Sequence, residues 1–141
     1  FTQDYLPPDP STYITLSSGN KAAYIGVVAA QTSTIQASYI AESGAILVEF
    51  ATPDETISAL RNGEVDAVMA DKAFLSPIVA ESNDELKFIG KDVFIGGGVG
   101  MGIRESDNSL KDTFNAVITS MKSDGSLNAL IDKWDISEGR Y

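Results

Sequence analysis

The chain contains 141 residues, of which 43% are apolar and 21% are charged, and this composition is typical of one globular domain rather than of a disordered or fibrous chain. Its net charge of −10 repels nucleic acid, so we exclude DNA and RNA as partners. The sequence has no cysteine and no histidine, which excludes the nucleophile–base pairs, zinc sites and iron–sulfur clusters that depend on them. We therefore expect neither a metal nor a cofactor.

Residues 1–90 alternate between apolar, β-branched runs and segments that carry helix start signals. YIGVVAA at 24–30 and AILVEF at 45–50 are typical of buried strands, and TPDE at 52–55 is a capping box with proline at the first helical position. We expect strands at residues 1–6, 12–16, 24–30, 45–50, 65–70 and 86–90. We expect helices at residues 35–43, 53–61 and 71–80. This alternation predicts an α/β fold with a parallel sheet and helices on both of its faces.

The pattern changes after residue 95. GGGVGMGIR at 96–104 predicts an extended segment whose glycines allow close approach of another backbone. These glycines do not form a phosphate-binding loop, because neither G-x-G-x-x-G nor GK[ST] fits them. Two amphipathic helices follow, at 109–123 and 127–134. The apolar stripe of the first has the spacing i, i+4, i+7, i+11 and consists of Leu110, Phe114, Val117 and Met121.

Polar side chains follow two of the predicted strands, at the points where the chain turns into a helix. The hydroxyls and helix amides of QTST at 31–34 suit a carboxylate or another anion, although Ser33 or Thr34 is also a natural N-cap. Asp71 either caps the next helix or holds an ammonium group. Ligands of open α/β sheets bind outside the carboxyl ends of strands, so one anion-binding and one cation-binding group at this edge would suit a free amino acid.

Several blocks of the sequence resemble one family of transport proteins. The most specific are GEVDAVMAD at 63–71 and SDGSLNALIDKW at 123–134, and IGVVAAQTSTIQASYI at 25–40 and the opening FTQDYL lie in the matching order. In these blocks the chain resembles the type II periplasmic amino-acid-binding proteins of ABC transporters, solute-binding protein family 3, which includes lysine/arginine/ornithine and histidine binders. The resemblance implies two α/β lobes that close on a ligand like a hinge. It also implies a periplasmic location, an ABC permease as partner and delivery of a polar or basic amino acid to the importer.

The resemblance assigns binding roles to particular residues and a catalytic role to none. Asp71 would bind the α-ammonium group of the ligand, Val28 would line the pocket, and Gln36 would touch the ligand. Part of the α-carboxylate would be bound by hydroxyls and amides around Thr32, Ser33 and Thr34. The register of this loop leaves open which of the three is the direct contact.

The resemblance also divides the chain into parts. Residues 1–23 would be the hinge strand and connection, residues 24–98 the second α/β lobe, and residues 99–141 the return crossover and C-terminal helices that belong to the first lobe. Most of the first lobe would be lacking, which would leave the apolar stripe of the 109–123 helix without its cover. Because large exposed apolar areas are rare in stable monomers, a homodimer through residues 105–136 is one way to cover it.

Two other functions stay open on the same fold. One is an enzyme such as a cyclohexadienyl dehydratase, but the sequence pairs no second carboxylate with Asp71 and offers no histidine as a base. The other is the sensor domain of a receptor, but no apolar run reaches the roughly 18 residues of a spanning helix. We expect a binding protein rather than an enzyme.

Overall fold

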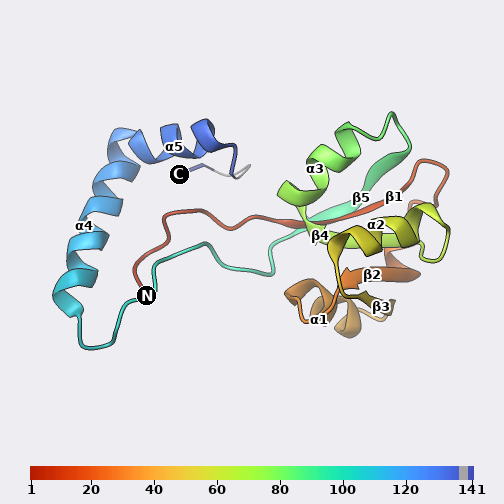
Figure 1. The fold of residues 1–141 in the computed structure, drawn as a ribbon, viewed down its shortest axis with the longest axis horizontal. Helices are drawn as coiled ribbons and strands as arrows, with labels where there is room; N and C mark the ends of the chain where they lie inside the picture. Colours follow the sequence, from red (N-terminus) through yellow and green to blue (C-terminus); the bar gives the residue numbers. More distant parts are fainter. Residues whose placement is uncertain (137–139) are drawn as a thin grey trace. The chain divides into compact units, whose positions relative to one another are not determined.

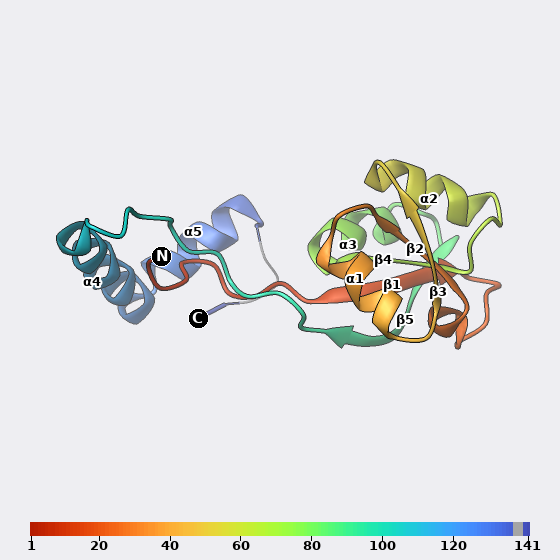
Figure 2. The ribbon, with the colours of Figure 1, turned by 90° about the horizontal axis from the view of Figure 1, so that it is seen from below.

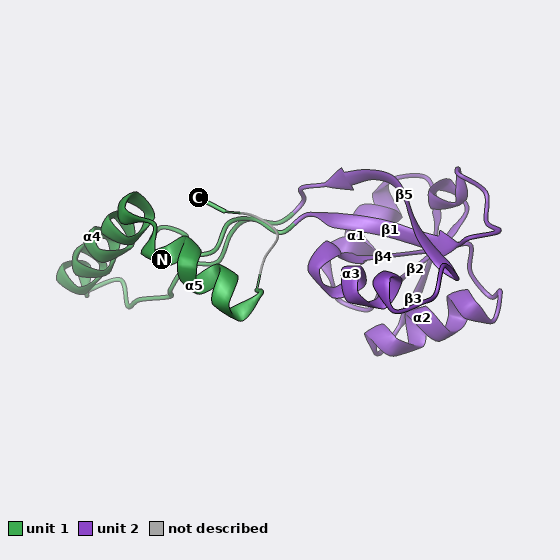
Figure 3. Ribbon diagram, turned by 90° about the horizontal axis from the view of Figure 1, so that it is seen from above, with its two compact units in different colours: residues 1–9, 96–141 green, residues 10–95 purple. Residues whose placement is uncertain are grey.

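The protein, in a computed structural model that describes residues 1–136 and 140–141, forms two compact units. Unit 1 consists of Phe1–Asp9 and Gly96–Tyr141, and unit 2 of Pro10–Ile95 (Figure 3). Residues 10–23, the later part of the 1–23 segment that we assigned to the hinge strand and connection, lie in unit 2 with the α/β part of the chain. The assignment of the two units to the lobes of a hinged protein stays a prediction.

Unit 2 is built on a five-stranded sheet with the strand order β3-β2-β4-β1-β5 (Figure 1). The strands are β1 (Ser11–Leu16), β2 (Val27–Gln31), β3 (Ile46–Phe50), β4 (Ala67–Asp71) and β5 (Leu86–Val93). β2 is parallel to β3 and β4, whereas β1 is antiparallel to β4 and β5. The predicted α/β fold is confirmed, but the sheet is mixed rather than fully parallel, because β1 inserts between β4 and β5 in the opposite direction.

The helices of unit 2 follow the strands as the sequence predicts. They are α1 (Ile35–Glu42), α2 (Pro53–Arg61) and α3 (Lys72–Ala80), and a 3-10 turn, η1 (Ala23–Ile25), precedes β2. The capping box of α2 is confirmed: the Thr52 hydroxyl accepts from the Glu55 amide, and the Glu55 carboxylate accepts from the Thr52 amide. The strand predicted from residue 24 begins later, because residues 24 and 25 are part of η1.

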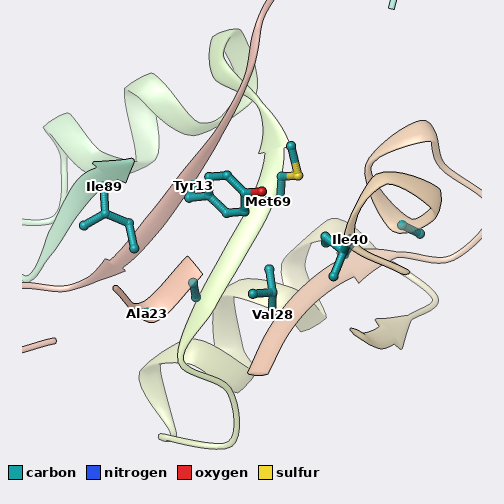
Figure 4. Packing of buried hydrophobic residues seen from close by; sticks show 9 residues of the cluster. Tyr13, Ala23, Val28, Ile40, Met69 and Ile89 are labelled. Carbon is teal, nitrogen blue, oxygen red and sulfur yellow. The ribbon is translucent and has the colours of Figure 1, made fainter. Parts of the chain in front are cut away.

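Successive residues of the central strands face opposite sides of the sheet and fill two separate cores. The core under α1 includes Tyr13, Val28, Ile40 and Met69 (Figure 4). The core under α2 and α3 includes Ile14, Ala29, Leu60, Val68 and Leu75. Helices therefore cover both faces of the sheet, as predicted (Figure 2).

The described residues of unit 1 form two helices, α4 (Asn108–Asp124) and α5 (Ser126–Trp134), and two extended segments that run beside each other. The strand predicted at 1–6 is absent. An isolated antiparallel bridge joins Leu6 to Val99 in its place, because the two segments meet at scattered backbone hydrogen bonds instead of a continuous ladder. In the part of the chain that the structure describes, no helix combines the length and apolarity that crossing a membrane requires.

Candidate functional site

The carboxyl ends of β2 and β4 form part of the wall of an open pocket in unit 2. The two strands are parallel neighbours, so both end at the same edge of the sheet. The pocket has a volume of ≈ 210 Å³ and is lined by Gln31, Thr34, Gln36, Pro53, Thr56, Met69, Ala70, Asp71 and Phe74. The prediction that Asp71 lies at the same sheet edge as segment 32–34 is confirmed, since Asp71 and Thr34 line one pocket.

Asp71 is the last residue of β4 and occupies the N-cap position of α3. Its side chain makes no capping hydrogen bond with that helix. The residue is exposed, and its Oδ1 accepts a hydrogen bond from Gln36 Nε2 at 2.7 Å. The sequence left two roles open for this carboxylate, a helix cap and a ligand-binding group. The structure shows no side-chain cap, and Asp71 lines the pocket.

Gln36 lies in the first turn of α1 and is only 6% exposed. Besides its bond to Asp71, Nε2 donates to Ser11 Oγ at 3.0 Å, and Ser11 stands opposite Asp71 in the β1–β4 pairing. We expected Gln36 to touch the ligand. The structure places it in the pocket wall with its amide nitrogen engaged by two protein groups.

The start of α1 lies at the pocket, which Thr34 and Gln36 help to line. Thr34 is the N-cap: its hydroxyl accepts from the Ala37 amide at 3.2 Å and donates to the Gln31 carbonyl at 2.7 Å. The first amides of a helix have no intrahelical partner, so they suit an anion. Thr32 and Ser33 are exposed and do not line the pocket, and Ser33 takes a left-handed backbone with φ of 60°.

Val28 is placed differently from our expectation of a pocket residue. It lies within β2, is 0% exposed and packs in the core under α1. Its register partners are Leu47 on β3 and Ala67 on β4, so strands cover it on both sides. The prediction of Val28 as a lining residue of this pocket is wrong, because its position three residues before the end of a buried strand keeps it beneath the surface.

Sequence reasoning missed several lining residues. Pro53 and Thr56 belong to the first turn of α2, which follows β3 at the same edge of the sheet. The rule that points to strand ends could have found these two residues. Phe74 and Met69 were missed because apolar side chains at such spacing are more often core residues, and Met69 is in fact 1% exposed.

No protein-family profile matches the chain. Among curated proteins, the histidine-binding periplasmic protein of Salmonella typhimurium is 31% identical over 127 residues, which cover 81% of this chain and 46% of the relative. The arginine-binding periplasmic protein of Mannheimia haemolytica is 24% identical over 140 residues, which cover 95% of this chain and 58% of the relative. The chain thus spans about half the length of the curated relatives that it matches.

A solved structure is also similar to the chain. It is a periplasmic His/Glu/Gln/Arg/opine family-binding protein from Silicibacter pomeroyi in complex with lysine, 60% identical to this chain, with a TM-score of 0.80 over 100% of this chain and 63% of that one. The chain is a homologue of the periplasmic amino-acid-binding proteins. The relatives reported from this family are named as binding proteins and not as enzymes.

Proposed function

We propose that the chain is the ligand-binding part of a periplasmic solute-binding protein that delivers a polar or basic amino acid to the permease of an ABC importer. The observation that carries this proposal is the pocket in which the Asp71 carboxylate and the start of α1 meet. These two groups complement the two charges of a free amino acid. The lysine bound to the 60% identical protein supports an amino acid with a basic side chain.

Asp71 accepts hydrogen bonds from the α-ammonium group of the ligand. Gln36 occupies one oxygen of this carboxylate, so Oδ2 keeps its capacity to accept from a cation. Hydrogen bonds between ionised groups are shorter and about twice as strong as neutral ones. Asp71 therefore offers the ammonium group an acceptor of opposite charge. Phe74 adds apolar surface to the same pocket.

The α-carboxylate of the ligand lies at the start of α1. The free amides of the first turn and the positive end of the helix dipole attract it. Thr34 is the nearest hydroxyl on the pocket wall, but its oxygen already joins two backbone groups. Thr32 and Ser33 are exposed just before the helix and are the alternative hydroxyls for this contact, although neither lines the pocket.

We also propose that residues 105–136 pair with a second copy of the chain. In α4 the side chains of Leu110, Phe114 and Val117 are 47%, 36% and 50% exposed, and Trp134 of α5 is 65% exposed. Burial of such a stripe in a second copy would remove it from water. Light scattering over a concentration series tests this: a mass that rises toward twice the monomer supports it, and a monomer at every concentration contradicts it.

A thermal-shift screen of the common amino acids tests the main proposal. We expect basic amino acids to raise the melting temperature of the chain and to be recovered unaltered, because a bound ligand stabilises the folded state. Asp71→Asn should abolish the shift, whereas Asp112→Asn, which removes the same charge from α4 in unit 1, should retain it. Chemical conversion of the ligand would favour an enzyme, and the absence of any shift would contradict the proposal.

A further inference from the structure

We propose that Gln36 is a positioning residue whose side chain fixes the Asp71 carboxylate for the ligand and does not itself contact the ligand. This inference rests on the proposed function, since it concerns how the same pocket receives an ammonium group. It replaces the direct ligand contact that the resemblance implied for the Gln36 side chain.

The donors of Gln36 are already used within the protein. A primary amide nitrogen has two N–H donors, and those of Gln36 reach Asp71 Oδ1 at 2.7 Å and Ser11 Oγ at 3.0 Å. Ser11 is 1% exposed and Gln36 is 6% exposed, so this chain of bonds is built into the interior of unit 2. No side-chain amide proton of Gln36 is left for the carboxylate of a ligand.

The orientation of the amide follows from the same chemistry. If the amide were turned over, its oxygen would face the Asp71 carboxylate, and two acceptors would meet with no proton between them. The nitrogen is therefore the end that faces Asp71, and the hydroxyl of Ser11 supports it from the neighbouring strand.

The Asp71 side chain makes no capping hydrogen bond with α3 and is exposed, so another group must fix its orientation. Among the residues that the structure describes, the bond from Gln36 is the side-chain hydrogen bond that Asp71 Oδ1 accepts. A neutral donor is suited to this task, since an arginine or lysine in its place would neutralise the charge that the ligand requires. Ordering the carboxylate before binding lowers the entropic cost of binding, which corresponds to about 2- to 10-fold in Kd.

The test compares two ligands in titrations followed by NMR, which detects weak binding. L-lysine carries the α-ammonium group, and 6-aminohexanoate is the same molecule without it. Gln36→Met keeps the length of the side chain but removes both donors. We expect it to weaken lysine binding by about 2- to 10-fold and to leave 6-aminohexanoate binding unchanged. Ser11→Ala removes only the hydrogen bond between Gln36 and Ser11. It should also weaken lysine binding, but by less than Gln36→Met does.

A double variant separates positioning from general packing. In an Asp71→Ala background Gln36→Met should have no further effect on lysine binding, because the group that it positions is gone. Equal losses for both ligands, or an equal loss in the Asp71→Ala background, would overturn the inference, as would unchanged lysine binding in Gln36→Met. If the unmodified chain bound no amino acid, the proposed function would fail and the inference with it. If it bound lysine through Asp71 without any effect of Gln36, the inference alone would fail.

Discussion

Gly98→Ala is expected to disrupt the contact between the two extended segments of unit 1. A Cβ atom at this position would overlap the carboxylate of Asp4 and the backbone carbonyl oxygen of Leu6. The backbone of Gly98 is not in the left-handed region, so alanine itself is allowed there and the cost comes from the overlap alone. Asp4 can turn away, but the Leu6 carbonyl can move only with its segment.

The size of the effect follows from what such a movement would break. Val99 donates to the Leu6 carbonyl at 3.0 Å, Leu6 donates to the Val99 carbonyl at 3.3 Å, and Tyr5 donates to the same carbonyl at 2.8 Å. Each of these bonds contributes about 0.5–1.5 kcal/mol net, and overpacking costs typically about 1–3 kcal/mol. We expect the segment that carries Leu6 to move only partly out of the way. The free energy of unfolding of unit 1 should therefore fall by about 1–3 kcal/mol.

Urea unfolding together with amide hydrogen exchange measures this loss. Gly97→Ala is the matched control, because a Cβ atom there would meet nothing within 4 Å and no positive φ opposes it. Gly97→Ala should be neutral or stabilising by up to about 1 kcal/mol, whereas Gly98→Ala should also speed exchange of the Val99 and Tyr5 amides. Equal stability and equal exchange in the two variants would refute the reasoning.

Three further predictions concern unit 2. Ile40→Ala should lower the free energy of unfolding by about 2–5 kcal/mol in urea, because Ile40 is 0% exposed under α1; a loss below about 1 kcal/mol would contradict the assigned core. Thr52→Ala should cost about 1 kcal/mol in the same assay, and Thr52→Ser, which keeps the hydroxyl, much less. Burial, and then the nearby Tyr39, raise the pKa of the Tyr13 phenol, so its contribution to stability is complete below about pH 10 and is lost at higher pH. The melting temperature of Tyr13→Phe should therefore fall less than that of the unmodified protein as the pH rises above about 10. An identical fall in both proteins would contradict the raised pKa of Tyr13.

The local features of the fold could be predicted from the sequence because they depend on neighbours in the chain. The capping box at Thr52 and Glu55 involves residues three apart, and the N-cap at Thr34 lies directly before its helix. The alternation of apolar strands with short helices likewise indicated the α/β fold. Asp71 could be predicted as a pocket residue because it lies at the end of a strand, where ligands of open sheets bind.

The remaining features depend on contacts between distant parts of the chain. β1 was predicted as a strand, but no local signal shows that it inserts between β4 and β5. The bond from Gln36 to Asp71 joins residues 35 positions apart, and the bond to Ser11 joins residues 25 apart. The resemblance to binding proteins assigned a direct ligand contact to Gln36, and no local signal in the sequence indicated these two bonds. Val28 was misplaced for a related reason, since only the packing of α1 shows how deeply β2 is buried.

The central claim is that an amino acid binds in the pocket of unit 2 with its ammonium group on Asp71. A crystal structure of the chain grown with L-lysine tests this claim most directly. The account predicts the α-ammonium nitrogen within about 3.2 Å of the Asp71 carboxylate and the α-carboxylate at the first turn of α1. Lysine bound in this pocket with the opposite polarity, or bound only elsewhere on the chain, would contradict it.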